Sequence, residues 1–341
     1  MTSTLLITGA TGFIGSRVAR RATTLPTVRT TVLHHRRPVT RLPPATPVIT
    51  GDLAEPASLR GVCDGVDVLL HCASRIGGPA EDCEAVNARG TAALMAEARR
   101  AGVRRVVYLS TASVHGRGPF RGARPDELAR APVSATSRTR AAAEDAVLDA
   151  GGIVLRPHIV YGEGDRWVGP ALTALTRALP GTVDRWTARL SAIDVEDLAD
   201  ALLGTALAAE DALTSSVYHA NHPEPVTCHD LLRALAAAAG TPWPARDIGY
   251  PEARESLTAQ GRTTHDLDMV AVDHWFDSRA LWADLGRDPG PGFHGRFPGH
   301  AHWYRRALAA RATIPREPLA PGPAPQAPDQ VSSTVPSARR A

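Results

Sequence analysis

The sequence of 341 residues contains no lysine, so all 38 of its basic side chains are arginines. The codon preference of a GC-rich genome explains such a bias. Its chemical consequence holds whatever the cause, because a guanidinium stays protonated and cannot shuttle a proton. Any reaction mechanism that requires a lysine is therefore excluded.

Cysteines are also few, the net charge is small, and long apolar runs are absent. The four cysteines form no CxxC pair and the net charge is +3, and no stretch of about 18 apolar residues occurs. The chain runs from Met1 directly into Leu5–Ile7, without the pattern of a signal peptide. We expect a cytoplasmic protein, monomeric or homodimeric, with reduced thiols, no metal, and no nucleic-acid or membrane partner.

The first half of the chain alternates short apolar runs with helical patterns. This alternation is typical of a parallel sheet and predicts an α/β, Rossmann-type doubly wound fold with a smaller C-terminal substrate-binding lobe. The predicted strands are Thr4–Thr8, Arg29–Leu33, Pro47–Thr50, Val66–His71, Val106–Ser110 and Ile153–Arg156. The predicted helices are Phe13–Thr23, Asn87–Ala101, Arg138–Asp149, Val195–Ala208 and His229–Ala239.

Changes in composition suggest three parts. Residues 1–165 are predicted to form an NADP-binding Rossmann domain, which residues 190–220 complete. Prolines, tryptophans and short helices dominate residues 166–189 and 221–312, which we expect to form the substrate-binding lobe. Residues 313–341 are rich in Pro and Ala with little apolar patterning, and this predicts a disordered tail.

A glycine pattern follows the first predicted strand and opens the first predicted helix. Small residues let the backbone approach a pyrophosphate, and a helix N-terminus offers unpaired N–H groups with partial positive charge. The strand, turn and helix together give the pattern its meaning and predict a bound nicotinamide dinucleotide. The predicted contacts in this loop are Gly9, Thr11, Gly12, Phe13, Ile14 and Gly15.

Other strand ends offer further cofactor contacts. Asp52 and Leu53 follow the third predicted strand, where a carboxylate suits the adenine amino group. Cys72, Ala73 and Ser74 follow the fourth, and ligands of parallel sheets collect at carboxyl ends. Each segment alone also fits ordinary loop chemistry, but their order along the sheet favours a common site.

The end of the second predicted strand favours NADPH over NADH. An NAD site would place an acidic residue there to hold the ribose 2′-hydroxyl. This chain instead has His35, Arg36 and Arg37, which suit a 2′-phosphate. A solvated basic loop is the alternative.

These features resemble the extended short-chain dehydrogenase/reductase family, also described as NAD-dependent epimerases/dehydratases. The similarity covers about residues 3–310 and includes the glycine loop and the segments Asn87–Thr91, Val107–Gly116, Leu155–Gly162 and Ile193–Ala199. It implies the Rossmann fold and a nicotinamide cofactor. It also implies cofactor contacts from Asn87, Pro157 and Ile159.

The chain departs from this family at the reaction centre. The resemblance implies a Ser or Thr after the fifth strand, and Thr111 fits that position. It also implies a Tyr-x-x-x-Lys pair on the next helix, where this chain has Thr136 and Arg140. An aliphatic hydroxyl is a poor acid compared with a phenol, whose pKa is about 10 and tunable. Arg140 can bind the ribose but cannot shuttle a proton.

Three functions are compatible with that departure. The first is an NADPH-dependent ketoreductase in which a phenol of the substrate, beside its ketone, supplies the acid. The second is a non-catalytic, regulatory NADP-binding protein. The third is a sugar-nucleotide-type epimerase or dehydratase that uses another acid: His115, His158 or Tyr161.

The second lobe gives only general indications about the substrate. Trp167, Trp186 and Trp243 suit a large, flat molecule, although packing in a core or a lid is an alternative. The atypical site resembles that of ketoreductases of aromatic polyketide (angucyclinone-like) antibiotic biosynthesis. We therefore expect a bulky hydroxy-aromatic ketone. Its predicted contacts are Ser113, His158, Tyr161, Trp167 and Trp186.

Overall fold

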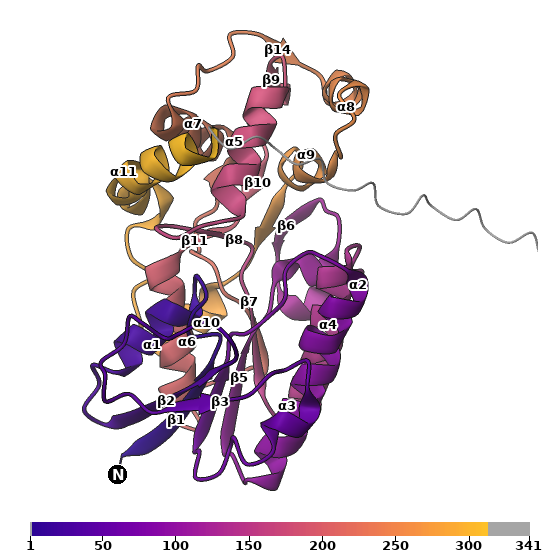
Figure 1. Ribbon diagram of the computed structural model, residues 1–341. Helices are drawn as coiled ribbons and strands as arrows, with labels where there is room; N and C mark the ends of the chain where they lie inside the picture. Colours follow the sequence, from indigo (N-terminus) through magenta and orange to yellow (C-terminus); the bar gives the residue numbers. More distant parts are fainter. Residues whose placement is uncertain (1, 313–341) are drawn as a thin grey trace, which may run out of the picture.

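A computed structural model describes residues 2–312 of the chain. Its centre is a parallel sheet of seven strands in the order β12-β7-β5-β4-β1-β2-β3 (Figure 1). The strands are β1 (Ser3–Thr8), β2 (Val28–His34), β3 (Val48–Thr50), β4 (Val68–His71), β5 (Arg105–Leu109), β7 (Ile153–Arg156) and β12 (Val217–His219). The predicted Rossmann-type doubly wound sheet is confirmed.

Helices cover both faces of this sheet (Figure 1). Alternate residues of a strand point to opposite faces: Leu5 and Ile7 of β1 pack in one cluster and Leu6 in another. One face carries α1 (Gly15–Ala22), α6 (Val195–Leu207) and α10 (Arg279–Leu285). The other carries α3 (Gly90–Arg100) and α4 (Ala135–Asp149), with α2 (Ala80–Cys83) and a π-helical segment (Glu84–Arg89) beside them.

A second group of elements has its own apolar core beyond the carboxyl ends of the sheet. Its helices are α5 (Val168–Ala178), α7 (Cys228–Ala239), α8 (Tyr250–Ala259), α9 (His265–Val270) and α11 (Gly292–Ala312). Its strands pair as β13-β10-β15-β6, β8-β11 and β9-β14. Their bounds are β6 (Phe120–Ala123), β8 (Ile159–Tyr161), β9 (Thr182–Val183), β10 (Arg189–Leu190), β11 (Ala192–Asp194), β13 (Val226–Thr227), β14 (Asp247–Ile248) and β15 (His274–Phe276).

Short 3₁₀ turns complete the description: η1 (Pro56–Leu59), η3 (Ala112–His115), η4 (Pro125–Glu127) and η5 (Asp184–Trp186). No helix within residues 2–312 is both long and apolar enough to cross a membrane. Over the same range, no group of three or more His, Cys, Asp or Glu side chains is placed to hold a metal. The division into domains stays a prediction, and the expected tail at 313–341 lies outside the described residues.

Candidate cofactor and active site

The glycine turn between β1 and α1 brings backbone segments into close contact. Gly9 has a φ of 72°, and a Cβ atom there would lie 2.7 Å from the amide nitrogen of Ala73. A Cβ atom on Gly15 would lie 2.8 Å from the carbonyl carbon of Gly9. Gly12 N–H donates to Gly9 O at 2.9 Å. The result is a cradle of bare backbone at a helix N-terminus, which fits a pyrophosphate.

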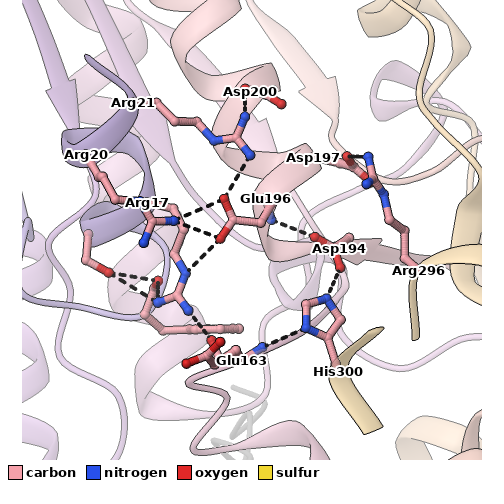
Figure 2. Close-up of polar contacts among 12 residues, drawn as sticks. Arg17, Arg20, Arg21, Glu163, Asp194, Glu196, Asp197, Asp200, Arg296 and His300 are labelled. Atoms are coloured by element: carbon pink, nitrogen blue, oxygen red, sulfur yellow. Dashed lines mark hydrogen bonds and ion pairs between the residues drawn. The ribbon is translucent and has the colours of Figure 1, made fainter. Parts of the chain in front are cut away.

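Arginines of α1 hold that helix against α6 through one carboxylate (Figure 2). Glu196 accepts from Arg17 Nε at 3.3 Å and from Arg21 Nη2 at 2.8 Å. Arg20 Nη2 donates to the same carboxylate at 3.1 Å. Glu196 thereby fixes the direction of the helix whose N-terminus lies at the cradle. Neither the glycine pattern nor the family motifs pointed to this cluster.

The same cluster continues to α11, as Figure 2 shows. Glu163 N–H donates to His300 Nδ1 at 3.3 Å, and His300 Nε2 lies 2.5 Å from Asp194 Oδ2. Because Nδ1 accepts, Nε2 carries the proton and donates to Asp194. Arg17 in turn donates to Glu163 O. Contacts among side chains and backbone therefore join α1, α6 and α11 beside the cradle.

The strand ends predicted to bind the adenosine lie together. His35 Nε2, after β2, is 2.8 Å from Asp52 Oδ2, after β3. The Asp52 carboxylate also accepts from Ala54 N–H at 2.9 Å. Arg36 and Arg37 are exposed at the same edge. The basic cluster is therefore open to solvent, and the nearby carboxylate already has a histidine partner.

His71 organises the end of β4 from within the core. Its Nδ1 lies 2.6 Å from Thr8 Oγ1, and its Nε2 lies 3.0 Å from Thr91 Oγ1. Ala73 N–H donates to Thr8 Oγ1 at 3.1 Å. Burial, with a smaller contribution from the Arg140 cation, lowers the pKa of His71 to about 3. A neutral imidazole thus fixes the turn that carries Cys72, Ala73 and Ser74.

Asn87 is placed to hold a loop. Its Oδ1 accepts from Arg75 N–H at 2.7 Å, and its Nδ2 donates to Arg75 O at 2.9 Å and to Thr139 Oγ1 at 3.0 Å. Both amide protons are therefore used within the protein. These bonds leave the Asn87 side chain no free donor for a cofactor. The predicted contact between Asn87 and the cofactor stays a prediction.

Thr111 lies at the carboxyl end of β5 and caps the turn η3. Its Oγ1 accepts from Ser113 N–H and donates to Ser113 Oγ, both at 3.2 Å. Ala112 N–H donates to Pro157 O at 2.8 Å, which joins the ends of β5 and β7. Buried Ile159 follows in β8. The structure therefore brings Thr111, Ser113 and Pro157 together.

Arg140 extends from α4 to the same strand end. It is 8% exposed, donates from Nη2 to Leu109 O, and lies 5.9 Å from the centre of the Tyr108 ring. Its Nε has no hydrogen-bond partner, and no carboxylate among residues 2–312 forms an ion pair with it. A buried cation with an unused donor needs an acceptor. The site therefore fits a cofactor ribose or a reacting oxygen.

Thr136, at the position of the family tyrosine, makes a contact that the sequence does not reveal. Its Oγ1 accepts from Gly77 N–H at 3.2 Å, and the Cys83 sulfur lies 3.8 Å away. The hydroxyl therefore contacts the loop that follows β4.

Three histidines, His115, His158 and His219, contact the Phe276 ring near η3. His115 Nδ1 contacts Ala129 O at 3.1 Å, so that nitrogen carries the proton, and His219 Nε2 donates to His115 Nε2 at 3.1 Å. His158 stacks on His274 with a centroid distance of 5.6 Å. Burial lowers the pKa of His115 to about 4 and that of His158 to about 3. These imidazoles are neutral near pH 7 and lack a proton to give readily.

The residues of the second lobe that were predicted to contact the substrate differ in how far they are buried. Tyr161 and Trp186 are each 2% exposed within the second core, and burial raises the pKa of Tyr161. Trp167 is 55% exposed at the start of α5. Tyr161 and Trp186 are therefore placed for packing in the core, which for Trp186 is the alternative stated from the sequence. Trp167 is available to a ligand.

Sequence reasoning did not identify three polar side chains that meet behind β5. Glu144 in α4 accepts from Ser110 Oγ at 2.5 Å and from Arg156 Nη2 at 2.6 Å. All three side chains are buried. The three residue types can be read from the sequence, but nothing in the sequence indicated that these side chains meet.

Comparisons with known proteins show the family of the chain. A model of the 3-beta hydroxysteroid dehydrogenase/isomerase family matches residues 6–247. A 2-alkyl-3-oxoalkanoate reductase of Stenotrophomonas maltophilia is 30% identical over 272 residues, which cover 71% of this chain and 81% of that protein. A 4-hydroxy-2-methyl-3-oxo-4-farnesyl-3,4-dihydroquinoline-1-oxide ketoreductase of Stigmatella aurantiaca is 30% identical over 216 residues, or 60% of this chain and 64% of that protein.

Among solved structures, the Bordetella bronchiseptica enzyme WbmH in complex with NAD+ is similar in fold. The TM-score is 0.71 at 20% identity, and the match covers 90% of this chain and all of that one (100%). At this identity the likeness concerns the fold alone.

Proposed function

The chain belongs to the 3-beta hydroxysteroid dehydrogenase/isomerase family within the extended short-chain dehydrogenases/reductases, and we propose that it is an NADPH-dependent ketoreductase. The proposed substrate is a bulky hydroxy-aromatic ketone of the polyketide type, made in antibiotic biosynthesis. Both named bacterial relatives are reductases of oxo compounds, which supports this reaction class.

The observation that carries the proposal is the cradle at the start of α1 together with the unpaired cation at the end of β5. Gly9, Gly12 and Gly15 would hold the pyrophosphate, and Arg140 would hold the nicotinamide ribose. A bound nicotinamide cofactor supplies the hydride. These residues of the chain bind and orient, and Arg140 offers positive charge where a reduced carbonyl oxygen becomes negative.

The preference for NADPH rests on the edge formed by β2 and β3. Arg36 and Arg37 are exposed, and the contact from Arg36 Nε to His35 Nε2 at 3.0 Å leaves the terminal guanidinium nitrogens to pair with a 2′-phosphate. Asp52 has His35 as its partner at 2.8 Å, and no acidic residue follows β2 in the segment His34–Arg41. Replacing both Arg36 and Arg37 by Ala should weaken NADPH binding by about tenfold or more and leave NADH binding almost unchanged. Titration calorimetry measures both, and an equal loss for the two cofactors would refute the assignment.

The proton is proposed to come from the substrate. The hydroxyl of Thr136 contacts Gly77, and the imidazoles of His115 and His158 are neutral, so none of these side chains is a ready acid. The Ser113 hydroxyl accepts from Thr111 and is left to donate a hydrogen bond that would orient a ketone oxygen. A phenol beside that ketone would act at high effective concentration.

The decisive experiment follows anaerobic NADPH oxidation with a peri-hydroxytetralone and with its O-methyl ether. The phenol should be reduced about 10²–10⁴ times faster, the usual worth of a positioned acid. Equal rates would refute substrate assistance.

A non-catalytic NADP-binding role is the second candidate, because the glycine cradle could bind the cofactor and binding alone needs no proton donor. It would be favoured if NADPH bound tightly while a panel of phenolic ketones gave no oxidation. An epimerase or dehydratase that uses His115, His158 or Tyr161 has less support, since Tyr161 is 2% exposed and both imidazoles are held neutral by burial.

A further inference from the structure

The loop Ser74–Pro79, between β4 and α2, is held against the helix α4. Gly77 N–H donates to Thr136 Oγ1 at 3.2 Å, in the first turn of α4. Gly77 and Gly78 both have positive φ, 68° and 84°. Backbone of this kind reverses direction sharply, and it lets the Gly77 amide face the helix.

The opposite side of the loop is tied down as well. Asn87 binds both backbone groups of Arg75 at 2.7 and 2.9 Å. The Cys83 thiol donates to Gly77 O at 3.6 Å. Asn87 also donates to Thr139, one turn beyond Thr136 on α4. The loop is therefore held by three side chains, and two of them, Thr136 and Cys83, contact Gly77 at its tip.

A tyrosine ring placed on the Oγ1 side of the Cβ atom at position 136 would collide with this loop. The hydrogen bond leaves 3.2 Å between Thr136 Oγ1 and the Gly77 nitrogen. An aromatic ring that extended from the same Cβ in the same direction would occupy the place of the Gly77 amide. In that rotamer the family phenol and the observed position of the loop are incompatible.

We propose that Thr136 is a positioning residue that anchors the loop Ser74–Pro79, and that the anchored loop forms one wall of the ketone site. Ile76, at the loop tip, is 43% exposed and offers an apolar surface to a flat aromatic ligand. The proposal that the loop forms a wall of the ketone site rests on the proposed ketoreductase function. The proposal that Thr136 anchors the loop does not.

Hydrogen exchange at the Gly77 amide tests the anchor in the protein without ligands. Thr136→Val removes the acceptor with little change of shape and should accelerate exchange at Gly77 by about 2- to 12-fold. Thr136→Ser should restore protection. Thr263→Val, at an exposed threonine, is the matched control and should leave Gly77 unchanged. Unchanged exchange in Thr136→Val would overturn the anchor.

Kinetics with the peri-hydroxytetralone test the wall. Thr136→Val should raise KM by several-fold with a much smaller change in kcat, and Thr136→Tyr should not raise kcat, because its ring displaces the loop. An unchanged KM in Thr136→Val, or a higher kcat in Thr136→Tyr, would refute the wall. If no ketone is turned over, the dissociation constant of the tetralone, from Trp fluorescence, replaces KM. The exchange result then separates failure of the anchor from failure of the proposed reaction.

Discussion

Lowering the pH should destabilise this protein well before its carboxylates titrate. Burial lowers the pKa of His71 to about 3 and that of His115 to about 4. In the unfolded chain a histidine has a pKa of about 6.5. Below that value the unfolded state binds protons that the folded state does not, so the free energy of unfolding falls as pH falls, until the folded pKa is reached.

The size of the effect follows from the two pKa values. Between about pH 7.5 and pH 5.5, each such histidine removes about 1.4 kcal/mol from the free energy of unfolding. His71 and His115 together remove about 3 kcal/mol, a large part of the 5–15 kcal/mol typical of a domain. His158 and His219 add to the loss, because burial lowers the pKa of each. Asp165 acts in the opposite sense, since burial raises its pKa.

Urea unfolding at the two pH values measures the loss, and one substitution isolates a single histidine. Asn at position 115 retains a donor for Ala129 O. His115→Asn should therefore lose about 1.4 kcal/mol less than the wild type on acidification. His265→Asn, at an exposed histidine, is the control and should behave as the wild type does. The same pH dependence in His115→Asn and the wild type would refute the reasoning.

Three further predictions concern the cradle, an exposed glycine of α11 and the carboxylate that holds α1. Gly15→Ala places a Cβ 2.8 Å from the Gly9 carbonyl carbon, and should lower the free energy of unfolding by about 1–3 kcal/mol and abolish NADPH binding measured by calorimetry. Gly299→Ala, in the exposed surface of α11 where a Cβ has no neighbour within 4 Å, should instead raise that free energy by about 0.4–1 kcal/mol in urea unfolding. Glu196→Gln leaves Arg17, Arg20 and Arg21 without their shared carboxylate, and should lower the free energy of unfolding by about 1–3 kcal/mol and weaken NADPH binding. Both effects should be larger than those of Glu252→Gln, which breaks one exposed ion pair.

The parallel sheet was predictable because its strands are continuous apolar runs bounded by loops. All six predicted strands are present within two residues of their predicted ends. The strand β12 was missed because Val217–His219 is short and gains its stability from pairing with β7. The helix predicted over Asn87–Ala101 is divided, because Glu84–Arg89 takes a π-helical form that turns Asn87 toward Arg75. Periodicity identifies a helix but not such a local change in winding.

The candidate site was predictable where one backbone segment carries the chemistry, as in the glycine turn. It was not predictable where two distant segments meet. Thr136 and Gly77 are 59 residues apart, and the three histidines that contact Phe276 come from η3, the segment between β7 and β8, and β12. The absent tyrosine was visible in the sequence, but the contact between Thr136 and the loop at Gly77 was not.

Arg140 connects the absent Tyr-Lys pair to the charge of the site. A lysine could lose its proton and relieve the cost of burial, whereas a guanidinium cannot. Arg140 is nevertheless 8% exposed, with Leu109 O as an acceptor and no carboxylate partner among the described residues. Its cation contributes to the lowered pKa of His71. A permanent buried charge of this kind is destabilising unless something negative binds beside it. An oxygen that gains negative charge during reduction would meet that requirement, so in the proposed reaction the substitution that removes proton transfer would also favour binding of the developing anion.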